Sequence, residues 1–358
     1  MNKNLFCTYF DSNYLNRGLS LIESLDRANS GQYQLVVVCV DEIVRLALEK
    51  LQIPQVLTVP LHEVEFRDRK LLACKDNRTA TEYMWTLTPS VILHLYERFP
   101  EYQHLTYVDA DLYFWSSQDA ILRELGSNQV LIHRHDFPER LEHLAIHGTY
   151  NVGLLCFQRS AQTKHILSWW RERCIEWCYK RLEDGKFGDQ GYLDQWPQTF
   201  EGVKVNQHPG IGTAPWNHER YLFSSNHAGI PCVNGIEIVF FHFHGIRLIS
   251  DGVILPCDQS IYDMTTNVYL TVYVPYLHSL ARSEAKIRQV LNNRSYGYLS
   301  EAHDLKADES VIVRTDKADA FFSLPFPHQR ILLDEQWTLA LNPFVSNLSN
   351  QPQSENVV

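Results

Sequence analysis

The sequence predicts an α/β protein built on a doubly wound sheet with helices on both faces. Two observations support this class. Strand-like apolar segments alternate with helical patterns, and polar side chains appear where several of the strands should end. A chain of 358 residues is long enough to bury one large core and carry an extension. Hydrophobic residues at 45% and charged residues at 21% are typical of a globular protein.

The predicted elements follow one another as strand, helix and strand. Residues 5–10 form the first expected strand, and leucine and isoleucine at helical spacing predict a helix over residues 15–25. A continuous valine-rich run predicts a central parallel strand over residues 34–40. The remaining expected strands cover residues 55–59, 105–108, 130–133, 150–157, 203–205 and 236–241, and the remaining helices cover residues 43–51, 90–96, 165–181 and 273–293.

The pattern changes near residue 255. We expect a main domain over residues 1–254, a C-terminal helical extension over residues 255–345, and a disordered Ser/Asn/Gln-rich tail over residues 346–358. The tyrosines of the extension have two possible roles, core packing or stacking on a ligand. They are Tyr262, Tyr269, Tyr273 and Tyr276.

Composition and charge limit the class of protein. A formal net charge of −10 argues against a general nucleic-acid surface, because phosphate backbones are bound by basic stripes. The apolar patch at the start of the chain ends at Asp11, which predicts no signal peptide, and we expect no transmembrane segment. A cytoplasmic location follows, with a peripheral place at the inner face of the membrane as the alternative. The 8 cysteines are expected to be reduced core residues.

The motif Asp-x-Asp stands where the fourth predicted strand of the chain ends. Asp109 and Asp111 follow an apolar strand, at the edge where α/β sheets bind ligands. Carboxylate oxygens suit Mn²⁺ or Mg²⁺, which fill their remaining positions with water and phosphate oxygens. A solvated turn is the alternative, and the apolar residues 112–115 directly after the motif make it less favoured.

Three further strand ends carry polar side chains. Asp11 and Asn13 follow the first strand, where they either cap a helix or contact a base or ribose. Asn151 lies at the start of the strand over residues 150–157, and His242 ends the strand over residues 236–241, with His244 on the same face. Because such ends share one edge of a doubly wound sheet, these groups are expected to surround one cleft.

Two other segments add candidates to this cleft. Asp189 and Gln190 stand between glycines, where the aspartate either caps a helix or projects into the cleft. Arg78 precedes a predicted helix, where it either meets a diphosphate or belongs to a solvated helix start.

These motifs, in this order, resemble a known family. Residues Asp11-Ser12-Asn13-Tyr14, Asp109-Ala110-Asp111, Asn151-Val152-Gly153, Asp189-Gln190 and His242-Phe243-His244-Gly245 are similar to those of the retaining nucleotide-sugar glycosyltransferases of the GT-A fold, family 8 and its relatives. The similarity spans about residues 3–250. It implies a GT-A-like, Rossmann-type α/β/α sandwich that transfers a hexose from a nucleotide diphosphate, with UDP as the expected nucleotide, to a glycan, lipid-linked or protein acceptor.

The resemblance also assigns roles to residues. It implies that Asp109, Asp111 and His242 ligate Mn²⁺ or Mg²⁺, and that Asp11 and Asn13 meet the uridine. It places Asn151, Asp189 and Gln190 at the donor sugar, with Gln190 beneath the anomeric carbon. Arg78 and Arg247 are the candidate contacts of the phosphates, and residues 255–345 are the expected acceptor side.

The chemistry leaves alternatives open. Gln190 is too weak a nucleophile for a covalent intermediate, so a retaining reaction favours front-face attack, with Asp189 as the second candidate nucleophile. An inverting enzyme would need a carboxylate base on the acceptor side. A metal-dependent phosphohydrolase and a catalytically silent nucleotide-sugar binding protein are the competing functions.

Overall fold

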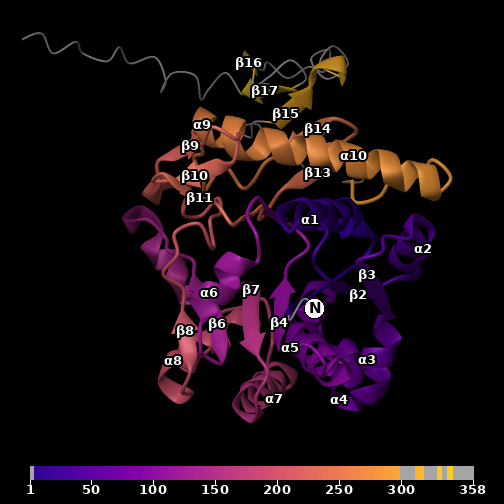
Figure 1. Ribbon diagram of the computed structural model, residues 1–358, viewed down its shortest axis with the longest axis vertical. Helices are drawn as coiled ribbons and strands as arrows, with labels where there is room; N and C mark the ends of the chain where they lie inside the picture. Colours follow the sequence, from indigo (N-terminus) through magenta and orange to yellow (C-terminus); the bar gives the residue numbers. More distant parts are fainter. Residues whose placement is uncertain (1–3, 299–310, 318–328, 333–336, 342–358) are drawn as a thin grey trace, which may run out of the picture.

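The centre of the protein is a seven-stranded sheet in the order β3-β2-β1-β4-β7-β6-β8 (Figure 1). The computed structural model describes residues 4–298, 311–317, 329–332 and 337–341. The strands are β1 (Asn4–Phe10), β2 (Leu35–Cys39), β3 (Val56–Pro60), β4 (His104–Val108), β6 (Val130–Arg134), β7 (Tyr150–Gln158) and β8 (Val203–Val205). All pairs are parallel except those of β7, which runs antiparallel to β4 and to β6. The predicted α/β class with a mostly parallel sheet is confirmed.

Helices cover both faces of this sheet (Figure 1). They are α1 (Leu15–Ala28), α2 (Glu42–Leu51), α3 (Leu61–Arg67), α4 (Arg69–Ala73), α5 (Ala80–Arg98), α6 (Asp119–Leu125), α7 (Ala161–Glu176) and α8 (Trp196–Thr199). Strand alternation divides the core, because neighbouring side chains of a strand point to opposite faces. In β1, Leu5, Cys7 and Tyr9 pack with α5 and α7, whereas Phe6 and Phe10 pack with α1 and α2.

Two helices differ from their predicted bounds. The helix expected over residues 90–96 is α5, which begins ten residues earlier at Ala80. Thr79 and Glu82 form a capping box there, and Pro89 lies inside the helix instead of before it. The first turns of α5 are polar, so no apolar pattern in the sequence marks where the helix begins. The helix expected over residues 165–181 is α7, which begins at Ala161 after the cap of Ser160 and ends at Glu176.

A two-stranded pair connects the edge of the main sheet to the C-terminal half. β5 (Leu112–Phe114) follows the Asp-x-Asp motif and pairs antiparallel with β12 (Phe240–His242). In this register, His242 lies opposite Leu112. Residues far apart in the sequence therefore meet at the motif.

The C-terminal part combines helix and sheet. A helical stretch of α9 (Thr266–Val268), the π-helical η6 (Tyr269–Tyr273) and α10 (Val274–Val290) confirms the predicted helix over residues 273–293. α10 lies beside α1 (Figure 1), where Asn16 Nδ2 donates to Glu284 Oε2 at 2.7 Å. The smaller strands are β9 (Phe223–Ser225), β10 (Pro231–Val233), β11 (Ile236–Glu237), β13 (Arg247–Ser250), β14 (Val253–Leu255), β15 (Val311–Arg314), β16 (Gln329–Leu332) and β17 (Trp337–Leu341). The last five form a second sheet, which the sequence did not predict.

Several smaller expectations are settled by burial. The tyrosines of the extension are all buried in one apolar cluster, so they pack in the core; they are Tyr262, Tyr269, Tyr273 and Tyr276. The cysteines are all free and buried, as expected. Within the described ranges, each helix is too short or too polar to cross a bilayer. The expected tail over residues 346–358 lies outside the described residues.

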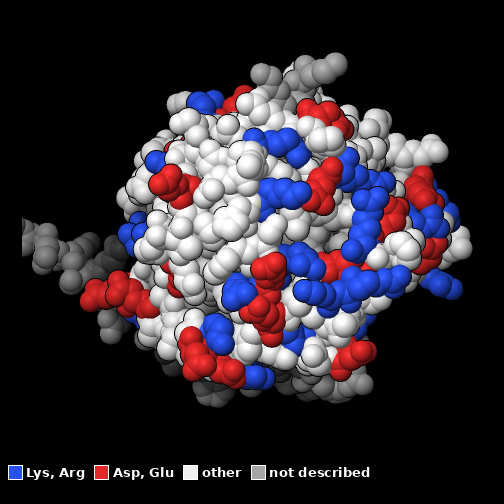
Figure 2. Space-filling model, turned by 90° about the horizontal axis from the view of Figure 1, so that it is seen from below, with Lys and Arg blue, Asp and Glu red and all other residues white. Residues whose placement is uncertain are grey.

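The surface carries both signs of charge. On the face seen from below in Figure 2, basic and acidic side chains alternate over most of the area that carries charge. This mixed pattern agrees with an acidic protein whose cations are dispersed.

Candidate functional site

Three side chains converge where β4 ends. One ligand atom each of Asp109, Asp111 and His242 lies within 4.8 Å of the other two. His242 Nε2 is 3.2 Å from Asp111 Oδ1 and 3.8 Å from Asp109 Oδ2. Two carboxylates and one imidazole facing a common point are a donor set that fits a divalent cation such as Mn²⁺ or Mg²⁺. The three residues predicted as metal ligands are therefore brought together.

The electrostatics of this cluster follow from burial beside like charge. Burial and the neighbouring Asp111 raise the pKa of Asp109, although His242 acts against them. Burial would also raise the pKa of Asp111, but His242, His244 and Arg17 lower it to about 2. Burial lowers the pKa of His242, yet the two carboxylates prevail and raise it. Two carboxyl groups therefore compete for one imidazole, and a divalent cation would favour the ionised form of both.

Gly153, on β7, allows the close approach on which the cluster depends. A Cβ atom at this position would lie 2.7 Å from His242 Nδ1 and 2.6 Å from Asn151 Oδ1. The backbone carbonyl of Gly153 accepts from the Asp109 amide at 2.9 Å, and its own amide donates to Asn151 Oδ1 at 2.8 Å. Because β7 is antiparallel to β4, its first residues lie at the carboxyl edge of β4. That geometry places Asn151 beside the cluster.

Asp189 and Gln190 are the next predicted site residues, and the charge of Asp109 acts on Asp189. Asp189 precedes the short 3-10 helix η4 (Gln190–Gln195) without a side-chain cap hydrogen bond, so capping does not explain it. Burial raises its pKa to about 7, with the negative charge of Asp109 adding to the effect of burial. Gln190 Nε2 donates to the carbonyl of His147 at 2.9 Å, which fixes the amide of this partly buried residue.

Asp11 and Asn13 lie at the carboxyl end of β1. Asp11 caps the short 3-10 helix η1 (Ser12–Tyr14), and its carboxylate accepts from the Asn13 backbone and side chain at 3.0 Å each. The capping interpretation of Asp11 is thus correct, while a role in binding a nucleoside remains a prediction. Partial burial and the carboxylates of Asp111, Asp109 and Asp11 raise the pKa of the neighbouring Tyr14, which connects this loop electrostatically to the metal cluster.

The two arginines predicted for the phosphates lie in different surroundings. The guanidinium of Arg78 stacks 3.8 Å from the centre of the Tyr179 ring, and its Nη2 donates to the carbonyl of Ile175 at 3.3 Å. These contacts tie Arg78 to the end of α7 and give it no contact with the Asp109 cluster. Arg247 begins β13, five residues after His242, and its side chain is partly buried.

Other residues of the site were missed at the level of sequence. His135 Nε2 accepts from Asn151 Nδ2 at 3.1 Å, since burial and the nearby His133 lower the pKa of His135 to about 3 and keep it neutral. Trp216 lies edge-on to His242, with ring centres 5.1 Å apart. The polar run 133–136 at a strand end was a usable signal for His135. No such signal pointed to Trp216, because the sequence of its turn contains no motif.

Comparison with known proteins gives the following relatives. No protein-family model matches the chain. The uncharacterized protein YfnF of Bacillus subtilis (strain 168) is 30% identical over 282 residues, which cover 77% of this chain and 89% of YfnF. The uncharacterized protein YfnD of the same organism is 27% identical over 297 residues, which cover 82% of this chain and 94% of YfnD.

Solved structures with a similar chain arrangement include three glycosyltransferases. The galactosyltransferase LgtC is 17% identical, with 66% of this chain and 86% of LgtC covered at a TM-score of 0.47. The bifunctional glycosyltransferase WbbM is 12% identical, with 82% of this chain and 52% of WbbM covered at a TM-score of 0.49. GlyE of Streptococcus pneumoniae TIGR4 is 11% identical, with 82% of this chain and 64% of GlyE covered at a TM-score of 0.43. At such identities the likeness concerns the fold alone. The sequence relationship is the stronger one, and by it this chain belongs to the family of Bacillus subtilis YfnF.

Proposed function

We propose that this protein is a metal-dependent glycosyltransferase that moves a hexose from a nucleotide diphosphate donor, with UDP as the first choice, to a glycan, lipid-linked or protein acceptor. The observation that carries the proposal is the convergence of Asp109 and Asp111, from the β4–β5 connection, with His242, from β12. The Asp-x-Asp motif and the ordered motifs around it resemble GT-A enzymes of family 8 and its relatives. The convergence supports the ligand role that this resemblance implies.

The residues divide into three groups by their proposed roles. Asp109, Asp111 and His242 would hold Mn²⁺ or Mg²⁺, which supplies Lewis-acid stabilisation of the departing diphosphate when bound. Asp11 and Asn13 would contact the nucleoside, and Arg247 would lie toward the phosphates. Arg78 would first have to leave the Tyr179 ring to take the same role.

The donor sugar would lie between Asn151, Asp189 and Gln190. The Gln190 amide is a poor nucleophile, and a carboxyl with a pKa of about 7 is only about half ionised at pH 7, which weakens Asp189 in that role as well. We therefore favour retention by front-face attack, in which the acceptor hydroxyl gives its proton to the leaving phosphate oxygen as the new C–O bond forms.

A cleft next to the segment that contacts Gln190 suits the acceptor, although its lining lies outside residues 255–345, the acceptor side that the resemblance implied. It measures about 330 Å³, and its lining includes Arg134, Asp136, Glu142, Thr149 and Arg220. The segment that forms one wall also holds Gln190 through the carbonyl of His147. Two cations and two carboxylates offer hydrogen bonds to the hydroxyl groups of a saccharide without a net charge.

The competing functions have less support. The Asp-x-Asp motif follows β4, whereas phosphohydrolases of the class considered place such a pair on the first strand. A silent binding protein would not need the intact set of Asp109, Asp111, His242 and Asp189.

A thermal-shift screen tests the proposal. Purified protein is melted with UDP-, GDP-, ADP- and dTDP-sugars, each with Mn²⁺ or with EDTA, beside the Asp111→Asn variant. A donor at 100-fold excess over its dissociation constant should stabilise the protein by about 2.7 kcal/mol. A shift that disappears with EDTA and in Asp111→Asn supports the proposal. No shift with any nucleotide sugar contradicts it, and release of inorganic phosphate in place of the nucleoside diphosphate would indicate the phosphohydrolase.

A further inference from the structure

A single guanidinium joins two loops of the proposed donor site, the β1 loop (residues 11–14) and the β12 loop (residues 243–246). Arg17 lies in the first turn of α1, and its Nη1 donates to the carbonyl of Asn13 at 2.9 Å. Its Nη2 donates to the carbonyl of Ile246 at 2.7 Å, 229 residues further along the chain. Arg17 is 5% exposed, so bulk water does not compete for these contacts. One buried side chain therefore holds both loops.

The contact at Ile246 continues through the backbone to the metal cluster. The Ile246 amide donates to the carbonyl of Phe243 at 3.2 Å, and the Phe243 amide donates to the carbonyl of Asp111 at 2.9 Å. Phe243 directly follows His242 in the chain. The β12 loop thus begins beside one predicted metal ligand, is hydrogen-bonded to a second, and ends on Arg17.

The contact at Asn13 lies in the loop that is proposed to meet the nucleoside. The amide and the side chain of Asn13 both donate to the Asp11 carboxylate at 3.0 Å. The guanidinium of Arg17 lies 4.6 Å from the centre of the Tyr14 ring, a platform that favours one orientation of its plane. Arg17 therefore contacts the β1 loop through a hydrogen bond and through a ring.

We propose that Arg17 is a positioning residue that sets the separation between the nucleoside end and the metal end of the donor site. A guanidinium donates from two nitrogens in one rigid plane, so it can hold the carbonyls of Asn13 and Ile246 at once, which the single ammonium of a lysine cannot do with the same geometry. A nucleoside diphosphate would span both ends, whereas a nucleoside or pyrophosphate would occupy one. Fixing the two ends in advance strengthens binding of the whole ligand more than binding of either part.

This inference rests on the proposed function in taking the two loops to hold opposite ends of one donor. The first experiment needs no donor. Hydrogen exchange is measured by mass spectrometry in EDTA on peptides covering residues 11–15 and 243–247. Their Tyr14 and Ile246 amides donate to the carbonyls of Asp11 and Phe243. Arg17→Lys should accelerate exchange in both peptides about tenfold, the equivalent of one hydrogen bond.

Arg159 is the matched control, because it makes the same kind of contacts at the opposite edge of the sheet. Its amide donates to the carbonyl of Gln103, just before β4 begins. Its Nε donates to the carbonyl of Tyr102 and its Nη2 to that of Phe99, at 2.8 Å each, and its guanidinium lies 4.2 Å from the centre of the Tyr96 ring. Arg159→Lys should leave exchange in both peptides unchanged.

Two results of the exchange experiment would overturn the inference. One is unchanged exchange over residues 243–247 in Arg17→Lys, and the other is equal acceleration in Arg159→Lys. If Arg17→Lys does not fold, Tyr14→Leu takes its place, because Tyr14 is 43% exposed and its loss leaves the core intact. Removing this ring loosens Arg17, so exchange over residues 243–247 should still accelerate, and no acceleration there would count against the role of Arg17.

The second experiment compares a whole ligand with its parts. Calorimetry with Mn²⁺ gives the dissociation constants of three ligands: the nucleoside diphosphate of the donor with the largest thermal shift, with UDP as the first choice, its nucleoside, and pyrophosphate. Arg17→Lys should raise that of the nucleoside diphosphate about tenfold and those of the two parts less than about twofold. Arg159→Lys should change none of the three.

The pattern of losses separates positioning from direct contact. Arg17 Nε is buried and has no hydrogen-bond partner within the described chain, so a direct contact with a phosphate would use this atom. Equal losses for pyrophosphate and the nucleoside diphosphate would show such a contact and overturn the positioning role. If no nucleotide binds the wild type, the proposed function fails, and the exchange experiment still decides whether Arg17 couples the two loops.

Discussion

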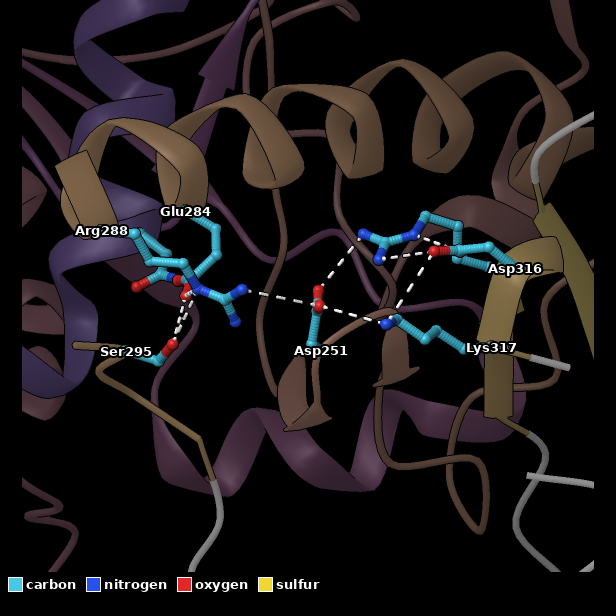
Figure 3. A network of polar contacts seen from close by, with 8 residues as sticks. Asp251, Glu284, Arg288, Ser295, Asp316 and Lys317 are labelled. Carbon is cyan, nitrogen blue, oxygen red and sulfur yellow. Dashed lines mark hydrogen bonds and ion pairs between the residues drawn. The ribbon is translucent and has the colours of Figure 1, made fainter. Parts of the chain in front are cut away.

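Two acidic regions of this protein differ in the cations that surround their carboxylates. Asp251, in the C-terminal part, faces Arg314 at 3.2 Å, Lys317 at 3.6 Å and Arg288 at 3.8 Å. Figure 3 shows Arg288 and Lys317 on either side of Asp251, and Glu284 and Asp316 balance the charge of the three cations. At the end of β4, by contrast, Asp109 and Asp111 share the single imidazole of His242 as their ion-pair partner in the described chain.

The difference separates a balanced surface network from the proposed metal site. The Asp251 network is partly exposed, and such networks add little to stability because water already screens their charges. In the Asp109 cluster two carboxyl groups share one imidazole, Asp111 and His242 are buried, and the pKa of Asp109 is raised, so the cluster should gain stability when a cation binds. Three experiments probe this contrast, from the largest expected effect to the smallest.

Removing one metal ligand should have the largest effect. Asp111→Asn leaves two of the three ligand groups, so we expect loss of Mn²⁺-dependent stabilisation and about a thousandfold drop in transfer rate, since the cation supplies several kcal/mol. Calorimetric Mn²⁺ binding and activity are measured together with far-UV circular dichroism, which should be unchanged. Asp316→Asn, in the balanced network, is the control and should bind Mn²⁺ normally. Full activity of folded Asp111→Asn would contradict the metal assignment.

Neutralising Asp189 should raise stability in a pH-dependent manner. Because its pKa rises from 3.8 in the unfolded chain to about 7 in the fold, the native state binds the proton more tightly. Stability from this group is therefore complete below pH 3.8 and is lost as the pH rises through about 7. Asp189→Asn avoids that loss.

Urea denaturation at several pH values measures the difference. At pH 8 we expect Asp189→Asn to exceed the wild type by up to about 4 kcal/mol, with the difference vanishing near pH 4. The exposed Asp184→Asn is the control and should show no such trend. A constant difference across this range would mean that Asp189 is not strained by its burial.

Breaking the balanced network should have the smallest effect. Asp251→Asn leaves three cations near one another, and we expect a loss of about 1 kcal/mol that shrinks in high salt, because exposed charges are screened. Glu97→Gln breaks the isolated surface pair with Lys164 and serves as the matched control, with a smaller loss still. A loss of several kcal/mol in Asp251→Asn would show that this network, and not the apolar contacts of α10, holds the C-terminal sheet.

Much of the site could be predicted because its residues stand beside strong strand signals. Asp109 and Asp111 follow an apolar strand, and His242 ends another, so an edge of an α/β sheet was a sound expectation for all three. Arg78 shows the limit of such reasoning. Its position before a helix suggested a phosphate, but its guanidinium stacks on Tyr179, a contact between segments whose pairing no local pattern indicates.

The sequence by itself determined the α/β class, the meeting of Asp109, Asp111 and His242 at one edge of the sheet, and the buried cysteines, because each depends on apolar patterns and on polar residues at strand ends. Only the tertiary structure decided that β7 runs antiparallel, so that Asn151 reaches the edge where β4 ends. It also decided the surroundings of Asp189, whose charge acts on Tyr9 and Cys174, from a strand and a helix far from it in the chain. Such neighbours depend on how elements pack across the sheet, and that packing sums many weak contacts that no short stretch of sequence contains.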